Sequence, residues 1–143
     1  MKKEKMKKLV RLNTLCVYDL VEFSEQIGKP LTEEQASVFC TQQTNTLTYG
    51  LYEESKLISI VIASLFLSYP VEGKPSGRVF YISSAGTLPD YRNNGYASTI
   101  LKVIEDDAKV LRADYILMSS ELEALARKNE YQIEQSFGSF KKL

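Results

Sequence analysis

Histidine is absent from this chain of 143 residues. Its absence removes the commonest general base, the commonest metal ligand and every catalytic triad that contains histidine. Cysteine is scarce. Cys16 and Cys40 lie far apart without the spacing of metal ligands, and both fall in amphipathic segments that predict buried thiols. The sequence therefore predicts no metal site.

Charge of one sign is not in excess, because 18 lysines and arginines balance 18 aspartates and glutamates. A dedicated nucleic-acid-binding protein usually carries a basic excess, so nucleic acid is not an expected partner. Long apolar runs are also missing. The most apolar segment, Leu57 to Leu67, is shorter than the about 20 residues that span a bilayer, and the lysine-rich start is not followed by the apolar part of a signal peptide. We therefore expect a cytoplasmic protein without a membrane partner.

The chain does have the composition of a globular protein, with 44% apolar and 25% charged residues. Its length fits one domain with a single core, which we expect to span residues 1–143. Met1 to Lys8 carries five lysines and one glutamate. This charge run predicts a solvated, disordered tail over residues 1–7.

Hydrophobic periodicity and turn residues divide the chain into strands and helices. Gly28-Lys29-Pro30 ends a first helix whose apolar stripe includes Leu15 and Tyr18, and Thr32 predicts the N-cap of a second helix. Tyr69 to Arg78 contains two prolines and two glycines and predicts a loop. The expected strands are 8–12, 46–52, 57–67, 79–83, 115–118 and 131–140, the last with a break at Gly138, and the expected helices are 15–27, 33–42, 98–111 and 121–128.

The helix over 98–111 carries an apolar stripe that runs from Ala97 to Leu111. It connects the strands 79–83 and 115–118. A crossover helix of this kind requires the two strands to be parallel.

The most informative segment is Pro89-Asp90-Tyr91-Arg92-Asn93-Asn94-Gly95-Tyr96-Ala97, which lies between the strand 79–83 and this helix. Backbone N–H groups at the start of a helix have no partner inside it, and the helix dipole adds partial positive charge there. Gly95 lets the backbone come close to a bulky anion because it has no Cβ, and small Ala97 keeps the first helical turn open. The segment therefore predicts a cradle for a phosphate group.

Two other phosphate-binding motifs fit this segment less well. A P-loop needs lysine and then serine or threonine after its glycine, where Tyr96 and Ala97 stand. A dinucleotide fingerprint needs three glycines at fixed spacing, and only Gly95 is present. The plainer interpretation is that Gly95 shapes a tight turn and Arg92 is a solvated surface residue.

The order of elements, together with an Arg-x-x-Gly-x-Ala turn formed by Arg92, Gly95 and Ala97, resembles the GNAT superfamily of acyl-CoA-dependent N-acetyltransferases. Leu88-Pro89 matches the residues just before the turn in that family. The resemblance covers nearly the whole chain. It implies an α/β fold of GNAT type: a mixed, mostly antiparallel sheet with one splayed parallel pair of strands and about four helices. The implied cofactor is acetyl-CoA or coenzyme A, with its pyrophosphate on the turn.

The resemblance also implies where the rest of the cofactor lies. The pantetheine arm would pair with the edge of Ala85 to Leu88, with a bulge at Ser84-Ala85-Gly86 that starts the splay. Ser119 matches a position near the thioester, although it fits the N-cap of the fourth helix equally well. The implied cofactor-binding residues are Gly86, Thr87, Leu88, Arg92, Asn93, Asn94, Gly95, Tyr96, Ala97, Ser98 and Ser119.

Two residues expected from the family's pattern are missing. Many members have a tyrosine that protonates the departing thiolate, and Ala126 stands at its place, four residues before Glu130-Tyr131. The strand 79–83 has Tyr81 and Ser83 in place of a glutamate base, and an aromatic on a central strand usually belongs to the core. A carboxylate acting through water is one type of base open to the chain. The candidates are Glu53, Glu121 and Glu123, none of which the sequence singles out, so the catalytic residues stay unassigned.

We therefore expect an N-acetyltransferase that acts on a primary amine of a small molecule or a protein. The missing tyrosine and glutamate keep open a second hypothesis, a catalytically weak acyl-CoA-binding or sensing module. A third is an unrelated α/β binding domain whose turn only mimics the motif. The expected partner is the amine substrate, and a homodimer is one assembly open to the chain.

Overall fold

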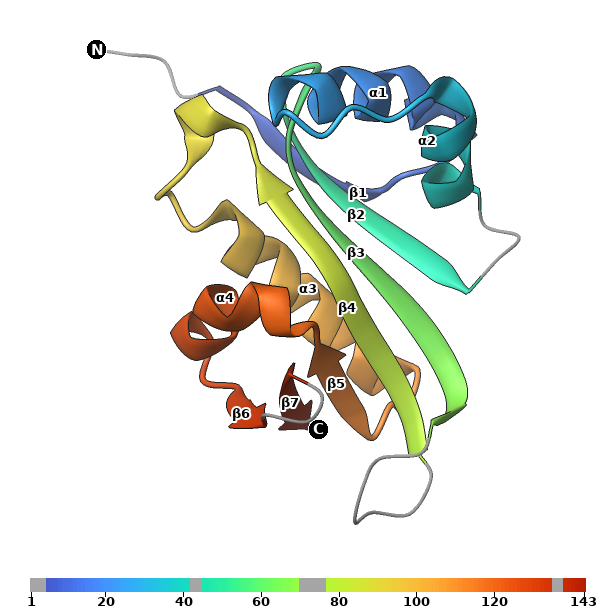
Figure 1. Ribbon diagram of the computed structural model, residues 1–143, viewed down its shortest axis with the longest axis vertical. Coiled ribbons are helices and arrows are strands. Elements are labelled where there is room, and N and C mark those ends of the chain that lie inside the picture. The colour runs from blue at the N-terminus through green and yellow to red at the C-terminus, as the bar shows by residue number, and fades with distance from the viewer. Residues whose placement is uncertain (1–4, 42–44, 70–76, 135–137) are drawn as a thin grey trace.

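Seven strands of the described chain form one mixed sheet, in the order β1-β2-β3-β4-β5-β7-β6 (Figure 1). This computed structural model describes residues 5–41, 45–69, 77–134 and 138–143. The neighbours β4 and β5 run parallel, and the other neighbouring pairs run antiparallel. The strands are β1 (Lys7–Arg11), β2 (Thr46–Glu53), β3 (Lys56–Tyr69), β4 (Gly77–Thr87), β5 (Tyr115–Met118), β6 (Gln132–Glu134) and β7 (Gly138–Lys142). The expected α/β fold, mostly antiparallel with one parallel pair, is confirmed.

Four α-helices and three 3₁₀ turns connect these strands within the described ranges. They are α1 (Val17–Gln26), α2 (Glu33–Cys40), α3 (Tyr96–Val110) and α4 (Glu123–Lys128), with η1 (Thr14–Cys16), η2 (Pro89–Tyr91) and η3 (Ser120–Leu122). Helices α1 and α2 pack together at one end of the sheet, α3 packs on β3 and β4, and α4 packs on β6 and β7 (Figure 1). No helix in the described segments is long and apolar enough to cross a bilayer.

Helix α2 begins with the N-cap that the sequence predicts. Thr32 Oγ1 accepts a hydrogen bond from Gln35 N at 3.1 Å, and Gln35 Oε1 accepts one from Thr32 N at 2.9 Å, which completes a capping box. The helix ends at Cys40, because Thr41 has extended backbone angles. The expected end at Gln42 is therefore too late, and Gln42 itself lies outside the described residues.

The core lies on both faces of β3, where residues 57–63 are all buried. Since successive side chains of a strand point to opposite faces, this run shows that both faces are covered, and α1 and α3 both pack on β3. Cys40 lies in this core, and burial raises the pKa of its thiol to about 11. Cys16 is only half-buried, so the expectation of a buried thiol is confirmed for Cys40 alone.

The expected apolar stripes of two helices are wrong in part. Leu15 lies in η1, before α1, and is 88% exposed, and Tyr18 is 70% exposed, whereas Leu20 and Phe23 of the same expected stripe are buried. Leu111 is 40% exposed and follows the last residue of α3. The same helix buries a carboxylate, Glu105, at 7% exposure. The partners of Glu105 come from elements much later in the chain.

Strand residues replace the described ends of the loop expected over 69–78 and of the tail expected over 1–7. Tyr69 belongs to β3, and Gly77 and Arg78 belong to β4, while residues 70–76 lie outside the described residues. Lys7 is the first residue of β1, so the tail predicted over residues 1–7 is wrong at its last position.

The single strand expected over 131–140 is a pair of antiparallel strands, β6 and β7, with residues 135–137 outside the described segments. Strand β7 also pairs with β5 and so extends the sheet beyond the parallel pair. Side chains alternate with a period of two along one long strand and along two short strands alike. The sequence pattern therefore does not distinguish one strand from two.

Candidate functional site

Strands β4 and β5 separate halfway along β4. Their pairing ends at Ile82 and Met118, and Ser119 N closes it with a hydrogen bond of 3.0 Å to Ile82 O. Strand β4 continues to Thr87 without β5 beside it, as Figure 1 shows. The register with β3 shifts at Ser83, which is the extra residue of a bulge. The expected splay is present, but the bulge is not at the expected Ser84-Ala85-Gly86. It lies at Ser83, directly after Ile82, the last β4 residue that pairs with β5.

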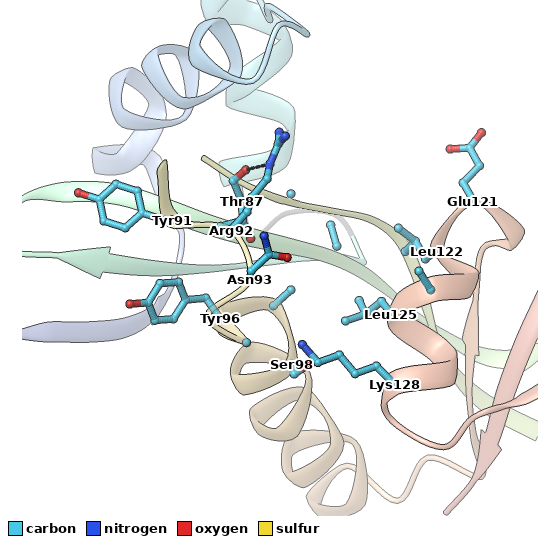
Figure 2. Close-up of a pocket in the computed structure, with 15 residues that line it drawn as sticks. Thr87, Tyr91, Arg92, Asn93, Tyr96, Ser98, Glu121, Leu122, Leu125 and Lys128 are labelled. Atoms are coloured by element: carbon cyan, nitrogen blue, oxygen red, sulfur yellow. Dashed lines mark hydrogen bonds between the residues drawn. The ribbon is translucent and has the colours of Figure 1, made fainter. Parts of the chain in front are cut away.

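Beyond the bulge, β4 presents a free backbone edge to this gap. Leu88 N donates to Ile58 O at 2.9 Å, so the backbone of Leu88 faces β3. Backbone groups alternate in direction along an antiparallel strand, so Ala85 and Thr87 face away from β3. Thr87 O accepts from Arg92 Nε at 3.1 Å (Figure 2). The N–H groups of Ala85 and Thr87 and the carbonyl of Ala85 remain directed to the gap.

The turn that follows β4 exposes a run of backbone donors. Gly95 is the N-cap of α3 and has a left-handed backbone with φ of 74°, and Thr99 N makes the first bond of the helix, to Gly95 O at 3.0 Å. Asn94 Nδ2 donates to the carbonyls of Tyr91 and Arg92, both at 3.1 Å, which fixes the shape of the turn. Within the described structure, the N–H groups of residues 93–98 donate to no protein acceptor. Such a run at a helix start is suited to an anion.

A cavity of about 470 Å³ lies between this turn and α4 (Figure 2). The free edge of β4 and the start of α3 form one wall, and η3 and α4 form the other. It is lined by Ala85, Gly86, Thr87, Tyr91, Arg92, Asn93, Gly95, Tyr96, Ala97, Ser98, Glu121, Leu122, Ala124, Leu125 and Lys128. The two ends of the cavity differ. The backbone N–H donors of the turn lie at one end, and the gap between the separated strands β4 and β5 lies at the other.

Most of the residues that the sequence assigns to the cofactor line this cavity. They are Gly86, Thr87, Arg92, Asn93, Gly95, Tyr96, Ala97 and Ser98. Leu88, Asn94 and Ser119 do not. Leu88 is buried at 3% exposure, and the Asn94 side chain is turned back onto its own loop. Ser119 Oγ accepts from Glu121 N at 3.4 Å, so the geometry favours the N-cap interpretation of Ser119.

Sequence reasoning missed the wall that η3 and α4 contribute. Leu122, Leu125 and Lys128 recur at a spacing of three, which places them on one face of a helical segment. That signal is present in the sequence, but it does not say which element the face meets. Tyr91, on the opposite wall, was also not assigned to the site.

None of the positions expected to carry the family's acid or base on β4 and α4 lines the cavity. Ala126 is fully buried in the core, and its carbonyl accepts from Tyr131 N at 2.9 Å. Tyr81 packs on the cluster of Val79 and Tyr115, and Ser83 Oγ lies 3.5 Å from the carbonyl oxygen of Ile62.

The three candidate carboxylates occupy different surroundings. Glu53 is paired with Lys5 and Lys7, each at 3.8 Å. Glu123 is paired with Arg127 at 3.0 Å. Glu121 is exposed and lines the cavity, and Figure 2 shows its carboxylate directed away from the other lining side chains. Of these three, Glu121 is the one that lines the cavity.

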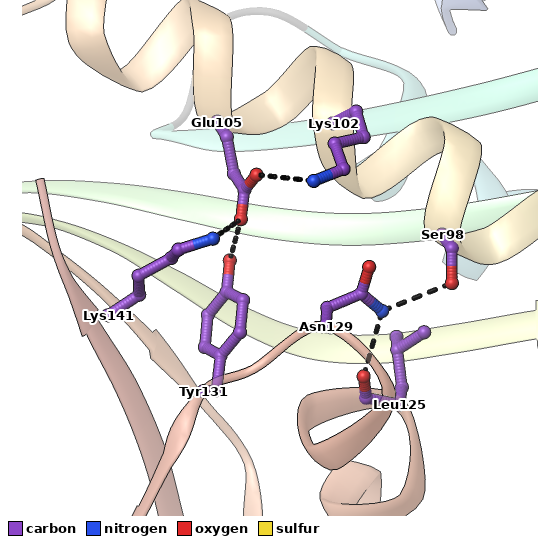
Figure 3. A network of polar contacts seen from close by, with 7 residues as sticks. All are labelled: Ser98, Lys102, Glu105, Leu125, Asn129, Tyr131 and Lys141. Atoms are coloured by element: carbon purple, nitrogen blue, oxygen red, sulfur yellow. Dashed lines mark hydrogen bonds and ion pairs between the residues drawn. The ribbon is translucent and has the colours of Figure 1, made fainter.

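The inner face of α3 is fixed to the end of the chain through Glu105. Glu105 Oε2 accepts from the Tyr131 hydroxyl at 2.8 Å and from Lys141 Nζ at 3.0 Å, and Lys102 lies 3.9 Å from the other oxygen (Figure 3). Burial, and then the hydrogen bond to Glu105, raise the pKa of Tyr131 above its ordinary value. Tyr131 therefore stays a protonated donor, and the buried carboxylate is satisfied.

Tyr131→Phe is expected to lower the free energy of unfolding by about 1–2 kcal/mol, because a buried carboxylate loses one of its donors. Urea unfolding at neutral pH measures the loss. Tyr18→Phe is the matched control, since the Tyr18 hydroxyl donates to Glu33 at 3.2 Å on an exposed surface. Equal losses in the two variants would show that the buried network adds nothing.

Residues 15–130 match the sequence profile described as the acetyltransferase (GNAT) family. No curated protein sequence matches the chain at a significant level.

Solved structures share the fold at low sequence identity. A ribosomal-protein-alanine N-acetyltransferase from Brucella melitensis biovar Abortus 2308 is 16% identical with a TM-score of 0.70, over 87% of this chain and 90% of that one. A predicted acetyltransferase from Clostridium acetobutylicum, solved with acetyl-CoA, is 17% identical with a TM-score of 0.72, over 92% and 94%. The aminoglycoside N-acetyltransferase AAC(6')-Iy, solved with CoA, is 12% identical with a TM-score of 0.71, over 91% and 88%.

Proposed function

This chain belongs to the acetyltransferase (GNAT) family, and from that premise we propose that it transfers an acetyl group from acetyl-CoA to a primary amine of a small molecule or a protein. Acetyl-CoA is the cofactor of this family. We assign residues 1–143 to a single acyl-CoA-binding domain. The observation that carries the proposal is the run of N–H groups over residues 93–98 that donate to no acceptor in the described part of the chain, at the edge of a cavity beside the strand splay.

The residues around the cavity fit the parts of coenzyme A. Apart from its chain neighbours, a Cβ built on Gly95 meets no atom of the described residues within 4 Å, so no described side chain blocks the approach of a phosphate to the backbone there. The edge groups of Ala85 and Thr87 suit the amides of a pantetheine arm, which pair as a strand does. Leu122 and Leu125 supply an apolar wall opposite this edge.

Bound acetyl-CoA supplies an acetyl thioester, which is already activated toward an amine. The chain then has to hold the reacting groups close together and accept a proton, and positioning alone delivers much of the rate. We assign the proton acceptor to the Glu121 carboxylate, acting on the acceptor ammonium through water, because of the three candidate carboxylates it is the one that lines the cavity. Ala126 offers no proton to the departing thiolate, so water or another group at the site donates it.

The amine that accepts the acetyl group is identified only by its chemical class. Among structures of similar fold, one is named for a protein amine and another for an aminoglycoside, so both kinds of acceptor stay within the proposal. The cytoplasmic location, the lack of a nucleic-acid partner and the homodimer stay predictions from the sequence.

Two assays test the proposed function. Calorimetry with acetyl-CoA should show binding at one site per chain. Acetyl transfer should then be measured on free amines, aminoglycosides and peptides with free terminal or lysine amines, with acetyl-CoA hydrolysis as the background. Transfer above that background supports the enzyme. Firm binding without transfer to any amine would favour the binding module instead, which the buried Ala126 at the tyrosine position keeps as the second candidate. Absence of binding would reject both.

Arg92→Ala is expected to weaken coenzyme A binding by only about 1–2 kcal/mol, because backbone donors make most of the phosphate contact and one charge-assisted bond is lost. Pantetheine, which has no phosphate, should bind the variant and the wild type equally. Arg127→Ala is the matched control, since Arg127 is exposed and paired with Glu123 on α4. An equal loss for both ligands would point to a damaged fold rather than to a phosphate contact.

A further inference from the structure

Asn129, the residue after α4, connects the end of that helix to the first turn of α3. Its Nδ2 donates to Ser98 Oγ at 3.1 Å and to the carbonyl of Leu125 at 2.9 Å (Figure 3). Ser98 and Leu125 line opposite walls of the cavity. The amide of Asn129 therefore joins the two walls at this point.

Simple chemistry fixes the orientation of this amide. The Leu125 carbonyl can only accept, so the nitrogen of Asn129 must face it, and the second N–H of the same nitrogen then donates to Ser98 Oγ. A hydroxyl that accepts from an amide still has its own hydrogen to give. Within the described residues Ser98 Oγ donates to no protein acceptor, whereas the neighbouring Thr99 hydroxyl donates back to Gly95 O at 3.0 Å.

We infer that Asn129 is a positioning residue for phosphate binding: it holds the Ser98 hydroxyl so that its hydrogen points into the cavity and donates to a phosphate oxygen of coenzyme A. The inference rests on the proposed cofactor site. Serine in a helix tends to turn its hydroxyl back to the carbonyl of the preceding turn, as Thr99 does here. The hydrogen bond from the Asn129 amide holds Ser98 Oγ and so opposes this rotation of the hydroxyl toward the preceding carbonyl.

The surroundings of Ser98 support an anion at this place. The N–H of Ser98 is the last of the unpaired donors over residues 93–98. Lys128 lines the cavity next to Asn129, and Figure 2 shows its ammonium reaching toward Ser98. A hydroxyl hydrogen directed to the same space adds one charge-assisted hydrogen bond to a phosphate.

The test replaces Asn129 with leucine, whose side chain has the same number and branching of heavy atoms but no donor. Asn129→Leu should weaken coenzyme A binding about tenfold, which is about 1.4 kcal/mol, and should leave pantetheine binding unchanged. Ser98→Ala should have the same effect. In the Ser98→Ala background, Asn129→Leu should add less than about twofold, because its action passes through the Ser98 hydroxyl. Calorimetry with the two ligands measures all four proteins.

Asn45→Leu is the matched control, since Asn45 Nδ2 donates to the Leu65 carbonyl at 3.1 Å and does not line the cavity. It should change neither ligand's affinity. If Asn129→Leu does not fold, Asn129→Asp replaces it: a carboxylate of the same size accepts from the Ser98 hydroxyl, turns its hydrogen away and repels phosphate, so the loss for coenzyme A should be larger.

Several results would overturn the inference and leave the proposed function intact. One is a Ser98→Ala loss without an Asn129→Leu loss. Others are equal losses for coenzyme A and pantetheine, or full additivity of the two substitutions, which would show that Asn129 only supports the fold. A wild-type protein that does not bind coenzyme A would instead reject the proposed function, and the inference with it.

Discussion

Gly95→Val is expected to weaken coenzyme A binding at least about 100-fold, because it removes the approach of phosphate to several backbone donors at once. Gly95 lies at the centre of the donor run, and its Cβ position is open space beside the cavity. A branched side chain there would occupy the place of the anion. Calorimetry with coenzyme A measures the effect, and pantetheine should bind the variant with little change.

The variant also strains the backbone, because a branched residue is disfavoured at a φ of 74°. Gly28→Val is the matched control for that strain. Gly28 has a φ of 79°, a Cβ built on it also meets no atom of the described residues within 4 Å apart from its chain neighbours, and it does not line the cavity. The two variants should lose similar stability in thermal unfolding, and Gly28→Val should keep its affinity for coenzyme A. Unchanged affinity in folded Gly95→Val protein would reject the phosphate cradle.

Ala85→Pro is expected to weaken binding of coenzyme A and pantetheine alike, by at least about tenfold. The N–H of Ala85 faces the gap and takes no part in the ladder with β3, so proline removes a donor for the pantetheine arm and places its ring in the gap. Since the β3 ladder is kept, the fold should lose little stability.

Gly86→Pro is the control for Ala85→Pro. The N–H of Gly86 faces β3, where Gly86 pairs with Ile60, so proline there breaks the ladder. We expect Gly86→Pro to be clearly less stable than Ala85→Pro in urea unfolding. If Ala85→Pro binds both ligands as the wild type does, the free edge of β4 is not the pantetheine site.

The phosphate end of the site could be predicted from the sequence because it is local. Gly95, Arg92 and the donors lie within one turn, and the strand before it and the helix after it set their direction. The parallel pairing of β4 and β5 followed from the crossover helix that joins them, whereas the splay was implied by the family resemblance. The bulge was misplaced because Gly86 favours a bulge by itself, whereas the structure sets it by the end of pairing at Ile82.

The second wall of the cavity could not be predicted in the same way because it depends on tertiary contacts. Lys128 and Leu125 are on a helix that comes long after the turn, and no local pattern says which face meets α3. The burial of Glu105 has the same origin, since a carboxylate on an apolar stripe is stable only with donors 26 and 36 residues away, Tyr131 and Lys141.

The most direct test of the account is an NMR titration of ¹⁵N-labelled protein with coenzyme A and with pantetheine. The account predicts that coenzyme A shifts the amide signals of residues 93–98 together with those of Ala85 and Thr87. Pantetheine should shift Ala85 and Thr87 and leave residues 93–98 in place, because it carries no phosphate. Saturable coenzyme A binding that leaves the amides of residues 93–98 unshifted would contradict the account.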